Sequence, residues 1–406
     1  MLLPALSRGA RATDVERLSY YCSSYEACRA TFLADVQRFL ETLPSEDRAR
    51  AEQHVWKVPS EADDDLTANY FYLPAKEQAK NLIVLTSGVH GIEGFVGNAA
   101  QRLFLKEILP TLDLSQTGIL LIHAINPFGM KYFRRVDEFN RDLGRNFELT
   151  RALFTMPNPE YSKMSPVLNP QTRASANLLA RFRFLFGTGY FLARTSLKEL
   201  RQAILQGQYH DPSGIYFGGS DFSPQRDWLK ELLETTARPY ANVMLGDFHT
   251  GYGNRGKLHL FEPALLPSAV LGNLRKLYRG LPTDAASSDD FYQNFGDFAN
   301  FVTELLVGQG KNVFPMTWEY GTVNNLGTAG ALESLWRMVT ENQRHHFGAT
   351  SDASKRSISA QFLGLFFPRE KKWRAGILEQ TYQQMALIAQ RFTQYGQCVD
   401  KIAAQK

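Results

Sequence analysis

His90 and Glu93 stand three residues apart in the sequence HGIE, a spacing that suits a metal site. The pair directly follows a short apolar run and opens a predicted helix, so both side chains can turn toward one point, and three nearby glycines ease the turn. Catalytic zinc takes three protein ligands and leaves the fourth position to water, so one more nitrogen is required. The same pattern also occurs by chance, as a helix-start histidine beside a solvated glutamate.

The third nitrogen is expected from His249, in the sequence DFHTG. A lone histidine after a core strand is usually packed and hydrogen-bonded, but Asp247 can orient a ligand imidazole. Because side chains alternate along a strand, we expect that bond only if His249 turns off the strand. Of the other histidines, His123 is expected in the core, and the pair at 345–346, after a predicted helix, on the surface.

Two further groups of residues carry possible chemistry. Arg134 and Arg135 precede Arg145, in the sequence DLGRNF, by about ten residues. Arginines so spaced can serve as an oxyanion stabiliser and as a bidentate clamp for a carboxylate. Glu319, in TWEYGT, is a carboxylate between aromatic residues, and apolar surroundings raise a carboxyl pKa toward the range of a general base. The alternative is a buried carboxylate paired with an arginine.

The elements that must position these residues are short apolar strands alternating with helices. Three of four later strands end at a candidate residue, and ligands bind at the carboxyl ends of strands in open α/β sheets. The expected strands are 54–58, 68–73, 82–85, 119–122, 243–245 and 313–318, and the expected helices are 26–43, 95–108, 227–235, 332–341 and 375–402. This alternation predicts an α/β fold with a twisted, mixed, largely parallel sheet flanked by helices.

The predicted organisation is a helical lead-in over 1–50 and a single catalytic domain over 51–406. Residues 150–235 are Arg-rich, aromatic-rich and interrupted by Gly, Pro and Ser. We interpret them as a long loop-like insertion near the site, because loops of this length usually have a function. There is no internal repeat, low-complexity tract or linker.

Composition narrows the class of protein. With 45 basic and 41 acidic residues the net charge is +4, and the basic residues are scattered, so no nucleic-acid partner is expected. No apolar run approaches the ~18 residues that span a bilayer, and no membrane partner is expected. Residues 1–6 are apolar but lack a charged leader, which argues against a secretory signal. Three cysteines (Cys22, Cys28 and Cys398) cannot all pair within one chain, and their sparseness fits the reducing cytoplasm.

The motifs HGIE, NPFG, RR with DLGRNF, DFHTG and TWEYGT, in that order, resemble the zinc carboxypeptidase superfamily (peptidase family M14). The chain is most similar to its bacterial DUF2817 branch, over residues 80–325. The resemblance implies a carboxypeptidase-like fold, also called phosphorylase/hydrolase-like, and one Zn²⁺ ion. It implies His90, Glu93 and His249 as the zinc ligands and Glu319 as the general base.

The same resemblance assigns the arginines. Arg135, preferred over Arg134, matches the arginine that polarises the scissile carbonyl, and Arg145 matches the arginine that grips the substrate's terminal carboxylate. One position departs from the family, which usually has Asn-Arg where this chain has Gly144-Arg145. The family's tyrosine near the leaving group could be any of three: Tyr216, Tyr252 or Tyr320.

The expected function is that of a zinc metallopeptidase of the carboxypeptidase type, which cleaves a C-terminal peptide bond with metal-activated water. One alternative is a zinc amidohydrolase for small N-acyl amino acids, of the desuccinylase or aspartoacylase kind, for which Gly144 leaves room. The other is a catalytically silent relative that binds a peptide. The partner is thus a peptide or an N-acyl amino acid, and the sequence does not specify an oligomeric state. The sequence contains no GxSxG motif, so a serine hydrolase is not expected.

Overall fold

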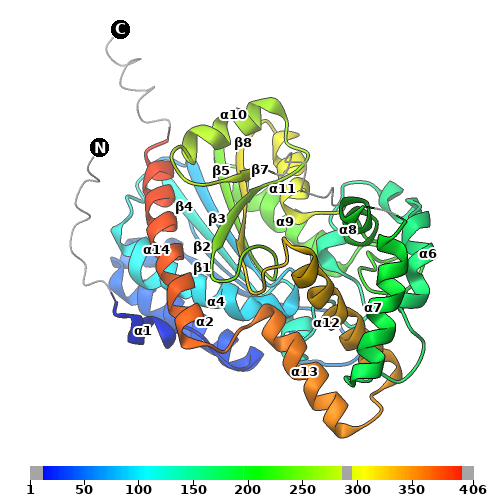
Figure 1. Cartoon of the computed structure of the whole chain (residues 1–406). Helices are drawn as coiled ribbons and strands as arrows, with labels where there is room; N and C mark the ends of the chain where they lie inside the picture. Colours follow the sequence, from blue (N-terminus) through cyan, green and yellow to red (C-terminus); the bar gives the residue numbers. More distant parts are fainter. Residues whose placement is uncertain (1–11, 195, 286–294, 396–406) are drawn as a thin grey trace.

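The computed structural model describes residues 12–194, 196–285 and 295–395, which are organised around one mixed sheet (Figure 1). Its eight strands lie in the order β1-β2-β4-β3-β5-β8-β6-β7. The strands are β1 (Glu52–Lys57), β2 (Thr67–Leu73), β3 (Asn81–Ser87), β4 (Thr117–His123), β5 (Asn242–Thr250), β6 (Leu258–Glu262), β7 (Asp284–Ala285) and β8 (Asn312–Tyr320). The six strands expected from sequence are present, and β6 and β7 are additional.

The centre of the sheet is parallel. Strand β3 pairs in parallel with β4 and β5, and β5 pairs in parallel with β8. The flanking pairs β1–β2, β2–β4 and β6–β8 are antiparallel. The predicted α/β class with a mixed, largely parallel sheet is therefore confirmed, and the carboxyl ends of β3, β5 and β8 lie side by side.

Alternate residues of the central strands enter two separate cores, as the period of two in a strand requires. Ile83 and Leu85 pack with one set of helices, which includes α2 (Tyr25–Thr42), α4 (Gly94–Leu103) and α14 (Lys371–Thr393). Leu82 and Val84 pack with the opposite set, α9 (Pro224–Ala237) and α11 (Phe298–Val307). Burial on both faces explains why these strands are continuously apolar.

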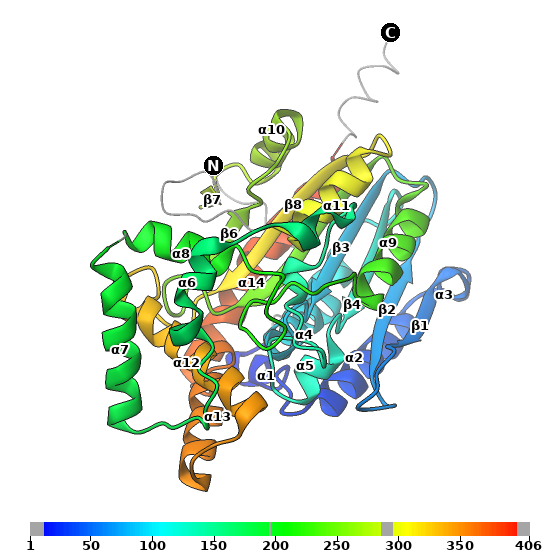
Figure 2. The same cartoon turned by 90° about the vertical axis from the view of Figure 1, so that its right-hand side faces the viewer.

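A third apolar cluster lies beside the sheet and unites distant parts of the chain (Figure 2). It joins α6 (Pro159–Leu168), α7 (Leu178–Leu192) and α8 (Leu197–Leu205) to α12 (Thr328–Phe347) and α13 (Asp352–Phe366). The loop-like interpretation was therefore wrong for residues 159–205, which form these three helices, whereas the helix expected at 227–235 is present as α9. Helices α6 and α7 bury few residues each, and Pro166, Gly187 and Gly189 inside them resembled turn signals.

The remaining helices are short or shifted relative to prediction. They are α1 (Asp14–Leu18), α3 (Ser45–Arg50), α5 (Pro127–Lys131) and α10 (Ser268–Leu277). The predicted helix 95–108 is α4 followed by a π-helical turn, η2 (Phe104–Ile108). The histidine pair at 345–346 is exposed as expected, but it lies within the last turn of α12 rather than after it. The end of the predicted helix 375–402 and residues 1–6 lie outside the described residues.

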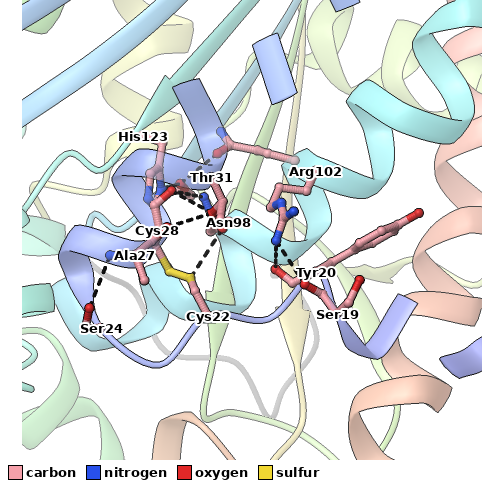
Figure 3. The surroundings of a disulfide bond; sticks show 12 residues. Ser19, Tyr20, Cys22, Ser24, Ala27, Cys28, Thr31, Asn98, Arg102 and His123 are labelled. Carbon is pink, nitrogen blue, oxygen red and sulfur yellow. Dashed lines mark hydrogen bonds between the residues drawn. A yellow bond between two sulfur atoms is a disulfide. The ribbon is translucent and has the colours of Figure 1, made fainter. Parts of the chain in front are cut away.

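Cys22 and Cys28 form a disulfide between the segment before α2 and α2 itself (Figure 3). Asn98 of α4 contacts both cysteines: its Oδ1 lies 3.5 Å from Cys22 Sγ, and its side-chain amide donates to the Cys28 carbonyl. This pairing was not predicted from the sequence, and Cys398 lies outside the described residues. Among the described helices, none is both long and apolar enough to cross a membrane.

Candidate active site

Two strand ends and one tight turn bring the candidate metal ligands together. His90 follows β3, and a 3₁₀ turn, η1 (Gly91–Glu93), returns the chain so that Glu93 faces it. A Cβ at Gly91 would overlap the backbone of Gly129 and Met130, so the close packing of this turn requires glycine. His249 lies near the end of the adjacent strand β5.

The donor atoms of His90, Glu93 and His249 lie within 4.8 Å of one another. Nδ1 of His90 is 3.0 Å from one Glu93 oxygen, and Nδ1 of His249 is 3.0 Å from the other. The two Nδ1 atoms are 3.1 Å apart. Two imidazole nitrogens and a carboxylate facing one point are the donor set of catalytic zinc.

The outer nitrogen of each imidazole contacts a carboxylate. Nε2 of His249 lies 2.7 Å from Asp247, and Nε2 of His90 lies 3.0 Å from Asp142. A guanidinium nitrogen of Arg135 also lies 2.7 Å from Nε2 of His90, so Asp142 and Arg135 together fix the orientation of this ring. Both rings turn Nδ1 toward the ligand cluster and Nε2 toward a carboxylate, an arrangement typical of metal-bound histidines.

Two sequence inferences change at this point. Asp247 and His249 are two residues apart within β5 and so share a face of the strand, which means that their bond needs no turn off the strand. The expectation that it did was wrong. Asp142 was not recognised as a site residue, although it begins the sequence DLGRNF. Its recognition needed the structure, because His90 lies 52 residues earlier.

Charge balance shifts the pKa values in this cluster. Burial acts to raise the pKa of the Glu93 carboxyl, but His90 and His249 hold it well below its usual range. Burial opposes ionisation of Asp142 too, yet Arg135, Arg145 and His90 hold its pKa well below the usual value. Both carboxylates are therefore ionised, as ligands and supporting groups of a cation must be.

The two neighbouring arginines separate in the structure. Arg135 lies against the ligand cluster, donating to Glu93 and Asp142 at 3.0 Å each. Arg134 is buried elsewhere, where it pairs with Glu341 of α12 and donates to Asn140. The structure thus brings Arg135 to the site and contradicts the placement of Arg134 as a substrate-binding residue, because its side chain contacts α12 instead of the cavity.

Arg145 borders the site but is covered by the insertion. Its side chain is only 1% exposed, donates twice to the Leu205 carbonyl of α8, and pairs with Asp142 at 2.9 Å. Its guanidinium also lies 4.8 Å from the centre of the Tyr216 ring. A Cβ at Gly144 would stand 2.6 Å from Nε2 of His90, so the residue before Arg145 is glycine because the imidazole occupies the space.

Glu319, near the end of β8, is opposite His249 in the strand pairing. One of its oxygens accepts a hydrogen bond of 2.8 Å from the backbone N–H of Tyr252. Burial, followed by the negative charge of Glu93, raises the pKa of Glu319 to about 8. Of the three tyrosine candidates, Tyr216 and Tyr252 line the cavity, whereas Tyr320 is buried against Thr381 of α14.

These residues line one side of a cavity of about 200 Å³. Another part of the lining is largely apolar and comes from helices α8, α12 and α13. Its apolar residues include Leu200, Ile204, Leu335, Met338, Leu365 and Phe366. The insertion thus supplies part of the cavity wall, through α8. The arrangement joins a metal-type donor set, a carboxyl of raised pKa and an apolar recess.

Comparison with known proteins gives the following likenesses. Bovine thrombin-activatable fibrinolysis inhibitor, in complex with tick carboxypeptidase inhibitor, has a TM-score of 0.42 and 12% identity over 85% of this chain and 97% of its own. Carboxypeptidase A from Helicoverpa armigera has a TM-score of 0.40 and 12% identity over 84% and 73%. A succinylglutamate desuccinylase/aspartoacylase family protein from Shewanella amazonensis has a TM-score of 0.35 and 17% identity over 73% and 72%.

No curated protein sequence matches the chain. The sequence pattern of a protein family described as "Protein of unknown function (DUF2817)" matches residues 21–380. The match runs from just before α2 into α14 and includes every residue of the ligand cluster.

Proposed function

The chain belongs to the DUF2817 family, and we propose that this member is a zinc-dependent hydrolase that cleaves an amide bond in a peptide or related substrate. The observation that carries the proposal is the convergence of His90, Glu93 and His249, with each imidazole supported by its own carboxylate. A cluster that only stabilised the fold would not need two histidines that both turn Nδ1 toward the same carboxylate.

The donor set fits zinc. Two nitrogens and one carboxylate leave the fourth tetrahedral position to water or substrate, as in catalytic zinc sites. Bound there, the ion supplies Lewis-acid chemistry: it lowers the pKa of water and polarises a carbonyl. His90, Glu93 and His249 hold it, while Asp142 and Asp247 fix the imidazole orientations.

The protein's own groups perform the proton transfers. Glu319 accepts a proton from the attacking water and returns it to the leaving amine. Burial raises the pKa of its carboxyl above the usual value, which helps it to hold the proton that it accepts. Arg135 presents its guanidinium beside the ligand cluster, where it stabilises negative charge that develops on the carbonyl oxygen. Removal of comparable donors costs about 2.7–4 kcal/mol of transition-state stabilisation.

Two substrate classes remain candidates. A carboxypeptidase needs a cation for the terminal carboxylate, the role that the resemblance gives to Arg145. Small N-acyl amino acids are the second candidate. They carry a carboxylate as well, so the contacts of the Arg145 guanidinium with Asp142 and the Leu205 carbonyl bear on both classes equally. In both cases the apolar wall of the cavity accommodates the substrate's hydrocarbon part.

The proposal is tested with the full chain loaded with zinc. Metal content is measured by mass spectrometry, and a mixed peptide library is incubated with free or amidated C-termini, alongside a panel of N-acyl amino acids. We expect one bound zinc and product formation that a chelator abolishes. Cleavage of only the free peptides identifies a carboxypeptidase, and cleavage of only the N-acyl panel identifies an amidohydrolase.

A pair of histidine variants provides the control. His249→Ala removes a ligand and is expected to lose both zinc and turnover. His210→Ala alters an exposed histidine that bonds Ser162 of α6, and it is expected to retain both. Stoichiometric zinc in a protein that cleaves neither panel, or equal zinc in the two variants, would contradict the proposal.

A further inference from the structure

Helix α7 exposes a row of large apolar side chains. Leu178 is 86% exposed, Phe182 65% and Phe186 72%, and Leu179, Leu185 and Tyr190 are exposed as well. This single helix holds six of the fourteen large apolar residues exposed in the described part of the chain. Monomeric proteins rarely expose contiguous apolar patches of this kind unless the patch binds something.

The row is a stripe on the outward side of the helix. At 3.6 residues per turn, Leu178, Phe182, Leu185, Phe186 and Tyr190 fall on one face. The opposite face is already used: Phe184 is buried and lies 5.3 Å from Trp336 of α12, measured between ring centres, and Thr188 is fully buried. Figures 1 and 2 both place α7 at the outer edge of the molecule. The stripe therefore takes no part in the protein's own core.

Arginines flank this stripe on both sides. By helical position, Arg181 lies on one side of it and Arg183 on the other, and both are exposed. Arg181 pairs with Glu333 of α12. Arg194, two residues past the end of α7, stacks on the Tyr190 ring at 3.6 Å. Residues 161–198 contain six Lys and Arg and no Asp or Glu, so this stretch of the chain carries a net positive charge.

We propose that α7 docks on the surface of a membrane that contains anionic phospholipids. An exposed helix with Phe and Leu on one stripe and arginines along its borders is the arrangement of interfacial helices, which insert the apolar side chains between headgroups. Arginine stems lie along the apolar surface while their guanidinium groups bind lipid phosphates. The sequence-based expectation of no membrane partner concerned spanning segments, which an interfacial helix is not.

The position of α7 would bring a bound membrane close to the cavity. Helix α7 packs against α8 and α12, the helices that form much of the apolar cavity wall. A membrane bound at α7 is therefore separated from the cavity by one layer of helix. The docking proposal itself does not depend on the metal site, because its readout is binding alone.

The test is co-sedimentation of the full chain with vesicles of phosphatidylcholine, with or without phosphatidylserine. We expect binding to the phosphatidylserine vesicles that weakens as salt is added. The double substitution Phe182→Ser with Phe186→Ser is expected to reduce binding about tenfold or more, because two exposed rings lose their apolar contact. Arg183→Gln with Arg194→Gln is expected to reduce binding only to the vesicles that contain phosphatidylserine.

Matched controls separate this surface from general stickiness. Val15→Ser with Val55→Ser removes two comparably exposed apolar side chains on α1 and β1, and it is expected to bind like the unmodified chain. Equal binding by the α7 variant and the unmodified chain would overturn the proposal. So would light scattering that shows a dimer disrupted by the Phe182 and Phe186 substitutions, because the stripe would then be covered by a second copy.

Discussion

The two walls of the cavity are built on different principles. The wall at the ends of β3, β5 and β8 consists of charged side chains held by one another, as in the contacts among His90, Asp142 and Arg135. The other wall, from α8, α12 and α13, consists of apolar side chains that belong to a hydrophobic cluster. The charged side chains of the first wall are held in fixed orientations, whereas the apolar side chains of the second wall define only the shape of the cavity.

This difference assigns separate tasks to the two walls. Directional groups at strand ends suit a reaction that needs a fixed geometry for metal and protons. An apolar wall suits selection among substrates by size, which one methylene group changes only modestly. We therefore expect substitutions in the polar wall to abolish turnover or metal binding, and substitutions in the apolar wall to change preference.

The largest effect is expected for the base. Glu319→Ala should retain zinc, since Glu319 is not among the ligand atoms, and should lose about 10²- to 10⁴-fold in kcat, the usual contribution of a general acid-base group. Glu319→Gln should behave alike. Kinetics on the identified substrate and metal analysis of the same samples provide the measurement.

Glu262 offers a matched comparison for this prediction. It is a second buried carboxylate that lines the cavity, from β6, but it pairs with Arg275 rather than facing the ligand cluster. Glu262→Gln should keep most of the turnover. Full activity in Glu319→Ala would remove Glu319 from the mechanism.

A smaller effect is expected for the carboxylate that orients a metal ligand. Asp247→Asn keeps the size of the side chain but removes the charge that orients His249, so zinc affinity should fall about 10- to 100-fold. Competition with a zinc-sensitive dye gives the affinity. The control is a second Asp–His pair, in which Asp284 lies 2.9 Å from His259, a histidine of β6 that is not one of the three ligand residues. Asp284→Asn should leave zinc affinity unchanged, and an equal loss in both variants would contradict the role of Asp247.

The polar wall was predictable from sequence because its signals are local. Strands β3, β5 and β8 are uniformly apolar, and each ends at or just before a residue with chemistry, so His90, Glu93, His249 and Glu319 could be named. Their convergence followed from the parallel pairing of these strands. Asp142 and the separation of Arg134 from Arg135 could not be named, because both depend on contacts between distant segments.

The apolar wall could not be predicted for the same physical reason. Leu200 and Ile204 lie on α8, whereas Leu335 and Phe366 come from helices more than a hundred residues later. Buried residues at 200, 203 and 204 give α8 an amphipathic face, but the sequence does not say which distant helices that face meets. The coverage of Arg145 by Leu205 could not be predicted for the same reason.

A substitution in the apolar wall tests its role in selection. Leu335→Ala enlarges the cavity, so relative kcat/KM should shift about tenfold toward substrates with a larger apolar group. Leu229→Ala provides the control, because Leu229 is fully buried in α9 and does not line the cavity. Both variants should lose about 2–5 kcal/mol of unfolding free energy, but only Leu335→Ala should change the preference. The same preference in both would show that the wall does not select.

The smallest effect concerns a histidine that resembles the ligands in burial but lacks their carboxylates. His123, in β4, is fully buried as expected, and its Nδ1 bonds Ser87 at 2.8 Å. Burial lowers the pKa of His123 to about 3, against about 6.5 in the unfolded chain. The unfolded state therefore binds more protons between these values, and the free energy of unfolding should fall by up to about 1.4 kcal/mol per pH unit as the pH drops from 6.5 toward 3.

His123→Asn isolates this contribution, because an amide can still bond Ser87 but does not titrate. Denaturant unfolding in the presence of a chelator, which keeps metal release out of the comparison, should give a shallower pH dependence for the variant than for the unmodified chain. His249 provides the contrast. Burial acts to lower its pKa, but Asp247 and Glu93 raise it well above the usual value, so in metal-free protein it stabilises the fold below pH 6.5. Parallel pH curves for the unmodified chain and His123→Asn would show that His123 is protonated in the fold, and that a carboxylate partner is not what distinguishes the ligand histidines.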